Sequence, residues 1–227
     1  SEDLGGGLSA FASSQLRYDA GNGRFNNTSG IANNESGFHL ATIGLRSATL
    51  GSFQIGRIGF DQLWGYNPWG STLAAVNPSR TAGATENGQF RYTSPNLWGF
   101  TAVVGGSMKD NNRRVTDATT FPATTVPANT YGRQYMLNYA NGPFAATVLA
   151  ERIAVASTPG GNKYRGLGAS YDFGFLKLMG IVAREETAAE VDVVDGYSIS
   201  AAAPIAGFVF KAGWMNDELA ANRDKTA

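Results

Sequence analysis

The residues that could carry chemistry in this chain are few. Its 227 residues include no cysteine and one histidine, His39. Disulfide frameworks, thiolate zinc sites and cysteine nucleophiles are therefore excluded. A Ser-His-Asp triad would depend on His39 together with a serine such as Ser13 or Ser36, and the chain has no P-loop or HExxH sequence. We expect no catalytic site, no metal site and no cofactor.

Charged side chains are sparse and balanced. Lys+Arg and Asp+Glu number 18 each, so the formal net charge is zero, and charged residues make up 16% of the chain. Ordinary soluble domains have roughly 25%. A balanced chain has no electrostatic basis for binding nucleic acid, so we expect no nucleic-acid partner. The acidic residues between Glu185 and Asp195 leave two interpretations open, a calcium site and a solvated loop.

The elements that must position any polar site are β-strands. Phe90 and Tyr92 alternate with Gln89, Arg91 and Thr93, and this period of two recurs along the chain. Many patterned segments are about ten residues long, which suits tilted membrane-spanning strands better than the shorter strands of soluble proteins. The pattern predicts eleven strands, at 8–18, 37–47, 51–58, 88–95, 99–109, 132–140, 143–153, 163–173, 175–186, 195–203 and 207–216.

The predicted connections alternate between short and long. Long polar connections are expected at 19–36, 59–87, 110–131, 154–162 and 187–194. Short turns are expected near 48–50, 96–98, 141–142, 174 and 204–206. Short turns at one end and long loops at the other are typical of an all-β, antiparallel, up-and-down transmembrane β-barrel. The alternative is a soluble β-sandwich that binds carbohydrate or acts as an adhesin, with aromatic side chains as sugar platforms.

The two faces of the predicted strands differ in polarity. One face carries aromatic residues near the strand ends, as a membrane barrel does at both interfaces. The other face is polar and small, with no bulky apolar layer to fill a dry core. An arginine that faces lipid at the membrane midplane costs roughly 2–4 kcal/mol. We therefore expect Arg91 and Lys177 to face a water-filled lumen.

Several segments, in chain order, resemble the trimeric general porins of Gram-negative bacteria, of the beta-proteobacterial type. Each segment is a weak signal by itself, but together they cover nearly the whole chain. They are Ser1–Ala10, Ile43–Leu45, Gly51–Arg57, Glu86–Asn87, Arg91–Phe100, Asn138–Phe144, Leu167–Gly174 and Ser200–Pro204.

The resemblance implies a single porin domain over 1–227, truncated at both ends. The family barrel has sixteen strands, of which this chain would hold strands three to thirteen and the tail of the second. It implies an outer-membrane homotrimer, with Leu8–Tyr18 and Gly37–Ser47 as parts of the contact surface. The expected surroundings are outer-membrane lipid and lipopolysaccharide. The expected function is passive diffusion of ions and small hydrophilic solutes through a water-filled pore.

The resemblance also implies that the loop 59–87, which corresponds to the third long loop of the family barrel and is called the third connection below, folds into the barrel and narrows the pore. Carboxylates and cations that face each other across such a constriction set its ion preference. His39 on the wall would make that charge depend on pH. The expected pore-lining residues are Asp61, Arg80 and Glu86 near the loop, and Gln15, His39, Arg57, Arg91, Glu151 and Lys177 on the wall. A barrel enzyme that uses His39 is the remaining alternative.

Overall fold

The computed structural model describes residues 1–16, 38–59, 63–69, 85–108, 132–155, 158–187, 190 and 192–219. The strands are β1 (Glu2–Gly5), β2 (Leu8–Leu16), β3 (Phe38–Ser47), β4 (Gly51–Gly59), β5 (Thr85–Thr93), β6 (Phe100–Ser107), β7 (Arg133–Asn141), β8 (Phe144–Val155), β9 (Thr158–Asp172), β10 (Lys177–Glu186), β11 (Asp192–Ile205) and β12 (Phe208–Leu219). A short 3-10 helix, η1 (Leu63–Tyr66), lies between β4 and β5. In these ranges there is no helix with the length and apolar character needed to cross a membrane.

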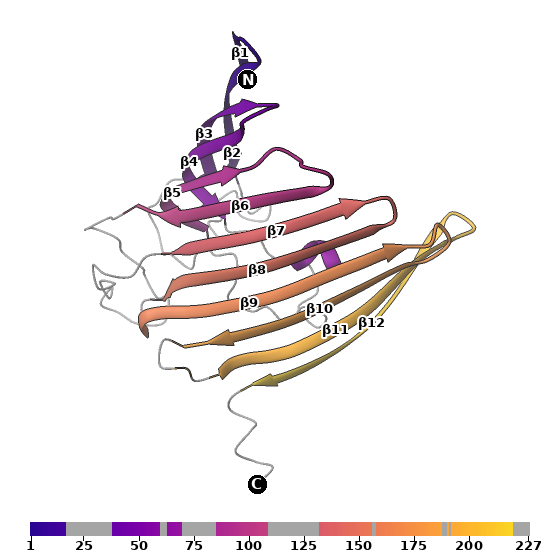
Figure 1. Ribbon diagram of the computed structural model, residues 1–227. Helices are drawn as coiled ribbons and strands as arrows, with labels where there is room; N and C mark the ends of the chain where they lie inside the picture. Colours follow the sequence, from indigo (N-terminus) through magenta and orange to yellow (C-terminus); the bar gives the residue numbers. More distant parts are fainter. Residues whose placement is uncertain are drawn as a thin grey trace, which may run out of the picture.

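All twelve strands belong to one antiparallel sheet, and each strand pairs with the next in the sequence. Figure 1 shows this sheet curving from β1 to β12 as a section of barrel wall. A β-sandwich has two packed sheets joined by crossovers, and the described strands have neither. The up-and-down fold is therefore confirmed, and the β-sandwich alternative is wrong.

The predicted strands correspond to β2 through β12, and β1 is the additional short strand at the N-terminal end. The main error concerns the connection predicted at 154–162. In the structure β8 continues to Val155 and β9 begins at Thr158, and these two residues pair directly. The glycines and polar residues of this segment suggested a loop. The pairing of β8 with β9 instead holds it extended, because tertiary context overrides weak strand propensity.

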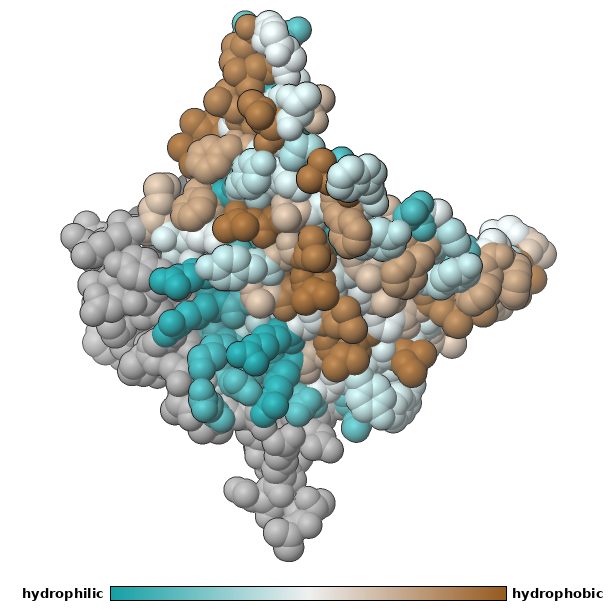
Figure 2. Space-filling model, in the orientation of Figure 1, coloured by the Kyte–Doolittle hydropathy of each residue, from teal (hydrophilic) through white to brown (hydrophobic). Residues whose placement is uncertain are grey.

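The two faces of the sheet carry different side chains. Leu137, Val148 and Leu167 lie on the outer face and are each about half exposed, at 47%, 54% and 47%. Gln134 and Glu151 lie on the inner face and are buried. Figure 2 shows brown, apolar side chains spread over the strands on the face in view. A row of large apolar side chains that no other element covers suits a lipid-facing surface.

The described part of the chain has a small apolar core, which lies between η1 and the inner face of the sheet. Leu63 of η1 is fully buried against Leu149, Tyr164, Ile181 and Ala183. The expectation of a uniformly polar inner face is wrong at this place. The reason is that Leu63 comes from a connection far from these strands in sequence, so strand patterning alone could not indicate its partners.

Candidate functional site

Mostly polar residues occupy one row across the inner face of the sheet, with a glycine at one position. Strand register places Gln54 opposite Arg91, and Gln134 opposite Glu151. Gly105 lies between Arg91 and Gln134 in the same row. These residues share one face because side chains alternate with a period of two along each strand. In full the row comprises Gln54, Arg91, Gly105, Gln134, Glu151, Tyr164 and Glu185.

Arg91 joins this row to the connection that leaves β4. Its Nη2 atom donates a hydrogen bond to the carbonyl oxygen of Gly59 at 2.6 Å and a longer one to Oε1 of Gln134 at 3.3 Å. Gly59 is the last residue of β4, where the third long connection begins. Arg91 therefore stabilises the base of this connection as well as placing positive charge on the inner face.

Glu151 brings a carboxylate into the same network. It is 5% exposed, and its Oε1 atom accepts a hydrogen bond from Nε2 of Gln134 at 2.6 Å. Gln134 thus links the guanidinium of Arg91 to the carboxylate of Glu151. A second buried carboxylate, that of Glu185, accepts a hydrogen bond from Nδ2 of Asn162 at 2.7 Å. The row therefore holds both signs of charge.

The segment that carries η1 docks on the inner face beside this row. The hydroxyl groups of Tyr66 and Thr147 lie 2.7 Å apart, and Thr147 donates to Oδ1 of Asn138 at 2.7 Å. Because the proton of Thr147 is used for Asn138, the Tyr66 hydroxyl is the donor to Thr147. Burial raises the pKa of the Tyr66 phenol above its usual value of 10.0, and the hydrogen bond to Thr147 partly offsets this shift.

Glycines on β9 and β12 make room for the docked segment. A Cβ atom at Gly168 would lie 2.3 Å from Cδ2 of Tyr66, and one at Gly166 would lie 2.6 Å from Cδ1 of Leu63. A Cβ atom at Gly213 would lie 2.9 Å from Cζ3 of Trp69. The aromatic rings therefore occupy the space that larger residues on these strands would fill.

Lys177 and Gln15 lie on the inner face away from the central row. Lys177 pairs with Asp172 on β9 and with Ala202 on β11, close to the short turn between β9 and β10. Gln15 pairs with Leu40 and is exposed. The register places Arg57 opposite Ala41, next to a bulge at Gly56. This is the face of Ile43 and Ile55, and not the face of Gln54.

Four candidate residues have no described side chain. His39 lies in β3 and Glu86 lies in β5, where the backbone of Glu86 pairs with Ile58. Asp61 and Arg80 lie outside the described residues, as does Ser36.

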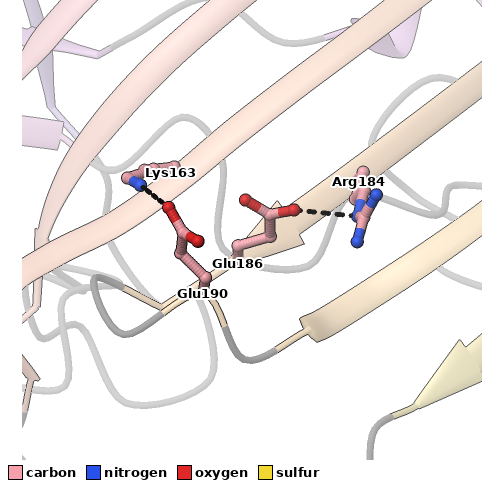
Figure 3. A network of polar contacts seen from close by, with 4 residues as sticks. All are labelled: Lys163, Arg184, Glu186 and Glu190. Atoms are coloured by element: carbon pink, nitrogen blue, oxygen red, sulfur yellow. Dashed lines mark hydrogen bonds and ion pairs between the residues drawn. The ribbon is translucent and has the colours of Figure 1, made fainter.

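The acidic residues near the end of β10 do not form one cluster. Glu185 faces inward, and Glu186 faces outward and pairs with Arg184 at 3.0 Å. Figure 3 shows this ion pair and the one between Lys163 and Glu190, which measures 3.3 Å. Among the described residues, no group of three or more His, Asp or Glu side chains could hold a metal ion. The calcium interpretation therefore has no support in the described part of the cluster.

Gln134 and Tyr66 are site residues that were missed from the sequence. Gln134 alternates with Arg133 and Tyr135, so the period-two pattern could have placed it on the inner face. The expected pore-lining residues were mostly charged and did not include Gln134. Tyr66 had no such signal, because its partner Thr147 is 81 residues away.

A curved up-and-down sheet with an apolar outer face and a polar inner face is the wall of a transmembrane β-barrel. The chain belongs to the Gram-negative porin family, which it matches over residues 1–227.

Known relatives agree with this assignment. The chain is 29% identical over 205 residues to an outer membrane porin protein of Bordetella pertussis. The match covers 81% of this chain and 49% of that protein, so the chain spans about half the length of this curated relative.

Two solved structures share the fold. The anion-selective porin from Comamonas acidovorans superposes with a TM-score of 0.72 at 23% identity, over 97% of this chain and 67% of that one. The Salmonella typhi OmpF, in a complex with daunomycin, has a TM-score of 0.67 at 14% identity, over 96% of this chain and 68% of that one.

Proposed function

We propose that this chain forms part of the wall of an outer-membrane diffusion channel, through which ions and small hydrophilic solutes pass in water. The observation that carries the proposal is the polar row of Arg91, Gln134 and Glu151 on the inner face of a sheet with an apolar outer face. A wall of this kind separates lipid from water without any chemical step. The protein is a channel and not an enzyme.

The third connection is the proposed constriction. Residues 63–69 dock on the inner face of the wall, which supports a connection that enters the barrel. Arg91 and Glu151 supply charges of opposite sign beside it, and such charges tune ion preference. Asp61, Arg80, Glu86, Gln15, His39 and Lys177 are further proposed lining residues. Arg57 is left out of this proposal, because its register position lies on the outer face.

A homotrimer is the proposed assembly. An open apolar groove of about 660 Å³ lies on the outer side of β2 to β4, and Ala10, Ala12, Ile43 and Leu45 are among its lining residues. The small side chains of Ala10 and Ala12 allow close approach of another subunit. The rest of the outer face would then contact lipid.

Conductance of the native protein, purified in detergent and inserted into a planar bilayer, tests the channel. We expect stepwise openings, grouped in threes for a trimer. In a salt gradient, the sign of the reversal potential then reports whether the constriction prefers anions or cations. Folded protein that inserts into the bilayer and conducts no current contradicts the channel.

A further inference from the structure

The inner face of the sheet carries a cation–π pair near the short turns. Cζ of Arg46 on β3 lies 4.9 Å from the centroid of the Phe11 ring on β2. Both residues are on the inner face, because Phe11 is opposite Gly44, and Gly44 is opposite Gln54 of the inner-face row. A cation within about 6 Å of an aromatic ring is attracted to it. The guanidinium of Arg46 is therefore held by the ring, although its side chain is exposed.

A glycine leaves the room that this pair needs. A Cβ atom at Gly44 would lie 2.6 Å from Cζ and 2.8 Å from Cε1 of Phe11. Glycine weakens the interior of a strand and often marks a close approach of this kind. Gly44 thus lets the Phe11 ring approach β3 closely, next to the side chain of Arg46 two residues further along the same face.

The charge of Arg46 is directed into the space in front of the inner face. Among the residues that the structure describes, its guanidinium forms no ion pair and no hydrogen bond. Ser9 on β2 and Ser52 on β4 are directly opposite Arg46, so uncharged side chains flank it on both sides. The next residue in this row, Asp3, accepts a hydrogen bond from the backbone of Gly5 in its own turn.

Other charges at this end of the inner face partly cancel. In the described ranges they are those of Lys177, which is opposite Asp172, and those of Asp3 and Lys211. Together with Arg46, the cations outnumber the carboxylates by one. Lys211 is exposed, and its flexible, hydrated ammonium group is less fixed in position than the guanidinium on the Phe11 ring.

The pair lies far from the proposed constriction. Arg46 is opposite Ser52 near the start of β4, and the third connection leaves β4 at Gly59. At about 3.3 Å per residue, Ser52 and Gly59 are about 23 Å apart along the strand. Arg46 therefore acts at one mouth of the pore and not at its narrowest part.

We propose that Arg46 is a specificity-determining residue at the short-turn mouth, where it favours the entry of anions from that side, and that Phe11 positions its charge. The inference rests on the proposed function, in which the inner face lines a water-filled pore with its short turns on the periplasmic side. A charge acts on ions over the Debye length, which is about 30 Å at 0.01 M salt and about 3 Å at 1 M. The effect of Arg46 is therefore large only when the dilute solution is on the short-turn side.

Reversal potentials of a single inserted channel test this role. The salt gradient runs from about 0.01 M to about 1 M potassium chloride and is applied to the same channel in both directions. We expect Arg46→Gln to lower the anion-to-cation permeability ratio about twofold in one direction and to leave it nearly unchanged in the other. Arg46→Lys keeps the charge and should keep both ratios. Phe11→Leu frees the guanidinium, so it should give a smaller change in the same direction as Arg46→Gln.

The matched control is Arg165→Gln, which removes the same charge from the outer face of β9 and should leave both ratios unchanged. Equal lowering in both directions by Arg46→Gln overturns the proposal, because the charge would then act at the constriction. A change in the control as large as that in Arg46→Gln also overturns it.

The double variant Phe11→Leu/Arg46→Gln tests whether Phe11 acts through Arg46. Its ratios should equal those of Arg46→Gln, and a further change would show that Phe11 has a structural role and does not position the charge. A protein that conducts no current contradicts the proposed function. A conducting channel whose ratios are unchanged by Arg46→Gln contradicts this inference alone.

Discussion

At the scale of single residues, Gln134 is the central member of the site. Its amide accepts from Arg91 and donates to Glu151, so it holds a cation and a carboxylate in one network. An amide can do this because it carries both a donor and an acceptor. The charges of Arg91 and Glu151 therefore keep fixed positions on the inner face.

Replacement of Arg91 by Gln removes the positive charge of this network. A unit charge in water contributes about 1 kcal/mol at 4 Å, which corresponds to a change of about two- to fivefold in the permeability ratio. We expect the permeability ratio of Arg91→Gln to shift by this amount in favour of cations. The reversal potential in a salt gradient measures the shift. Arg91→Lys is the control, because it keeps the charge and should keep the selectivity. An unchanged potential in Arg91→Gln would show that Arg91 does not contact the permeation path.

Replacement of Glu151 by Gln makes the opposite change in the same network. The new amide oxygen can still accept the hydrogen bond from Gln134, so stability should change by less than about 1 kcal/mol. The permeability ratio is expected to shift toward anions by about two- to fivefold. Reversal potential and thermal unfolding of the variant measure both effects. A shift toward cations contradicts the proposed role of Glu151.

Tyr66 makes docking of η1 sensitive to high pH. Its pKa is raised on folding, so its contribution to stability is complete below the unfolded pKa near 10.0 and is lost as the pH rises through the folded value. We expect wild-type conductance to stay constant to pH 10 and to rise above it, since the ionised phenol cannot donate to Thr147. Tyr66→Phe should show no such step. A rise in conductance of the same size in the wild type and in Tyr66→Phe would show that ionisable groups other than Tyr66 cause it.

At the scale of elements, η1 is held by a three-residue chain of hydrogen bonds and by glycines. The chain runs from Tyr66 through Thr147 to Asn138 on β7. Gly168 on β9 leaves room for the Tyr66 ring to approach the sheet closely. The position of η1 therefore depends on strands β7 to β9 and not only on its own sequence.

Gly168→Ala is expected to displace η1. The new Cβ atom would lie 2.3 Å from Cδ2 of Tyr66, so the ring must move away. We expect higher single-channel conductance and faster proteolysis of the third connection. Gly180→Ala on β10 is the matched control, because its Cβ atom would meet only the Ser198 carbonyl oxygen, at 3.5 Å. Equal conductance in the two variants contradicts a constricting role for η1.

At the scale of the whole molecule, the outer surface is divided between exposed apolar side chains, an apolar groove and a row of basic side chains at Arg133, Arg152 and Lys163. The groove lies on β2 to β4, and the basic row lies on β7 to β9. A trimer needs one part of the wall for subunit contact and leaves the others exposed to the membrane. This division agrees with the proposed assembly.

Ala12→Trp should weaken the trimer. Ala12 lines the groove, and insertion of a large side chain into a packed contact costs about 1–3 kcal/mol. We expect a larger monomer fraction on unheated gel electrophoresis in mild detergent. Val148→Trp adds a comparable ring at a site that is 54% exposed, where lipid can accommodate it. Loss of trimer in both variants, or in neither, contradicts subunit contact at the groove.

The sequence by itself determined the strands and their two faces. The alternation of Gln89 to Thr93 predicted which side chains would share a face, and the structure places Arg91 in the same row as buried Gln134 and Glu151. This information is local, because side chains in an extended chain alternate with a period of two. The resemblance of several segments, in chain order, to porins also indicated the family of the protein.

Only the tertiary structure decided which residues meet. The link from Arg91 to Glu151 spans four strands, and the docking of Tyr66 on Thr147 joins segments 81 residues apart. The opposition of Arg133 and Arg152 depends in the same way on the register of β7 with β8. Register is fixed by the pairing of whole strands and by the turns between them, and a slip of one residue would reverse every face. Contacts across strands are therefore properties of the folded sheet.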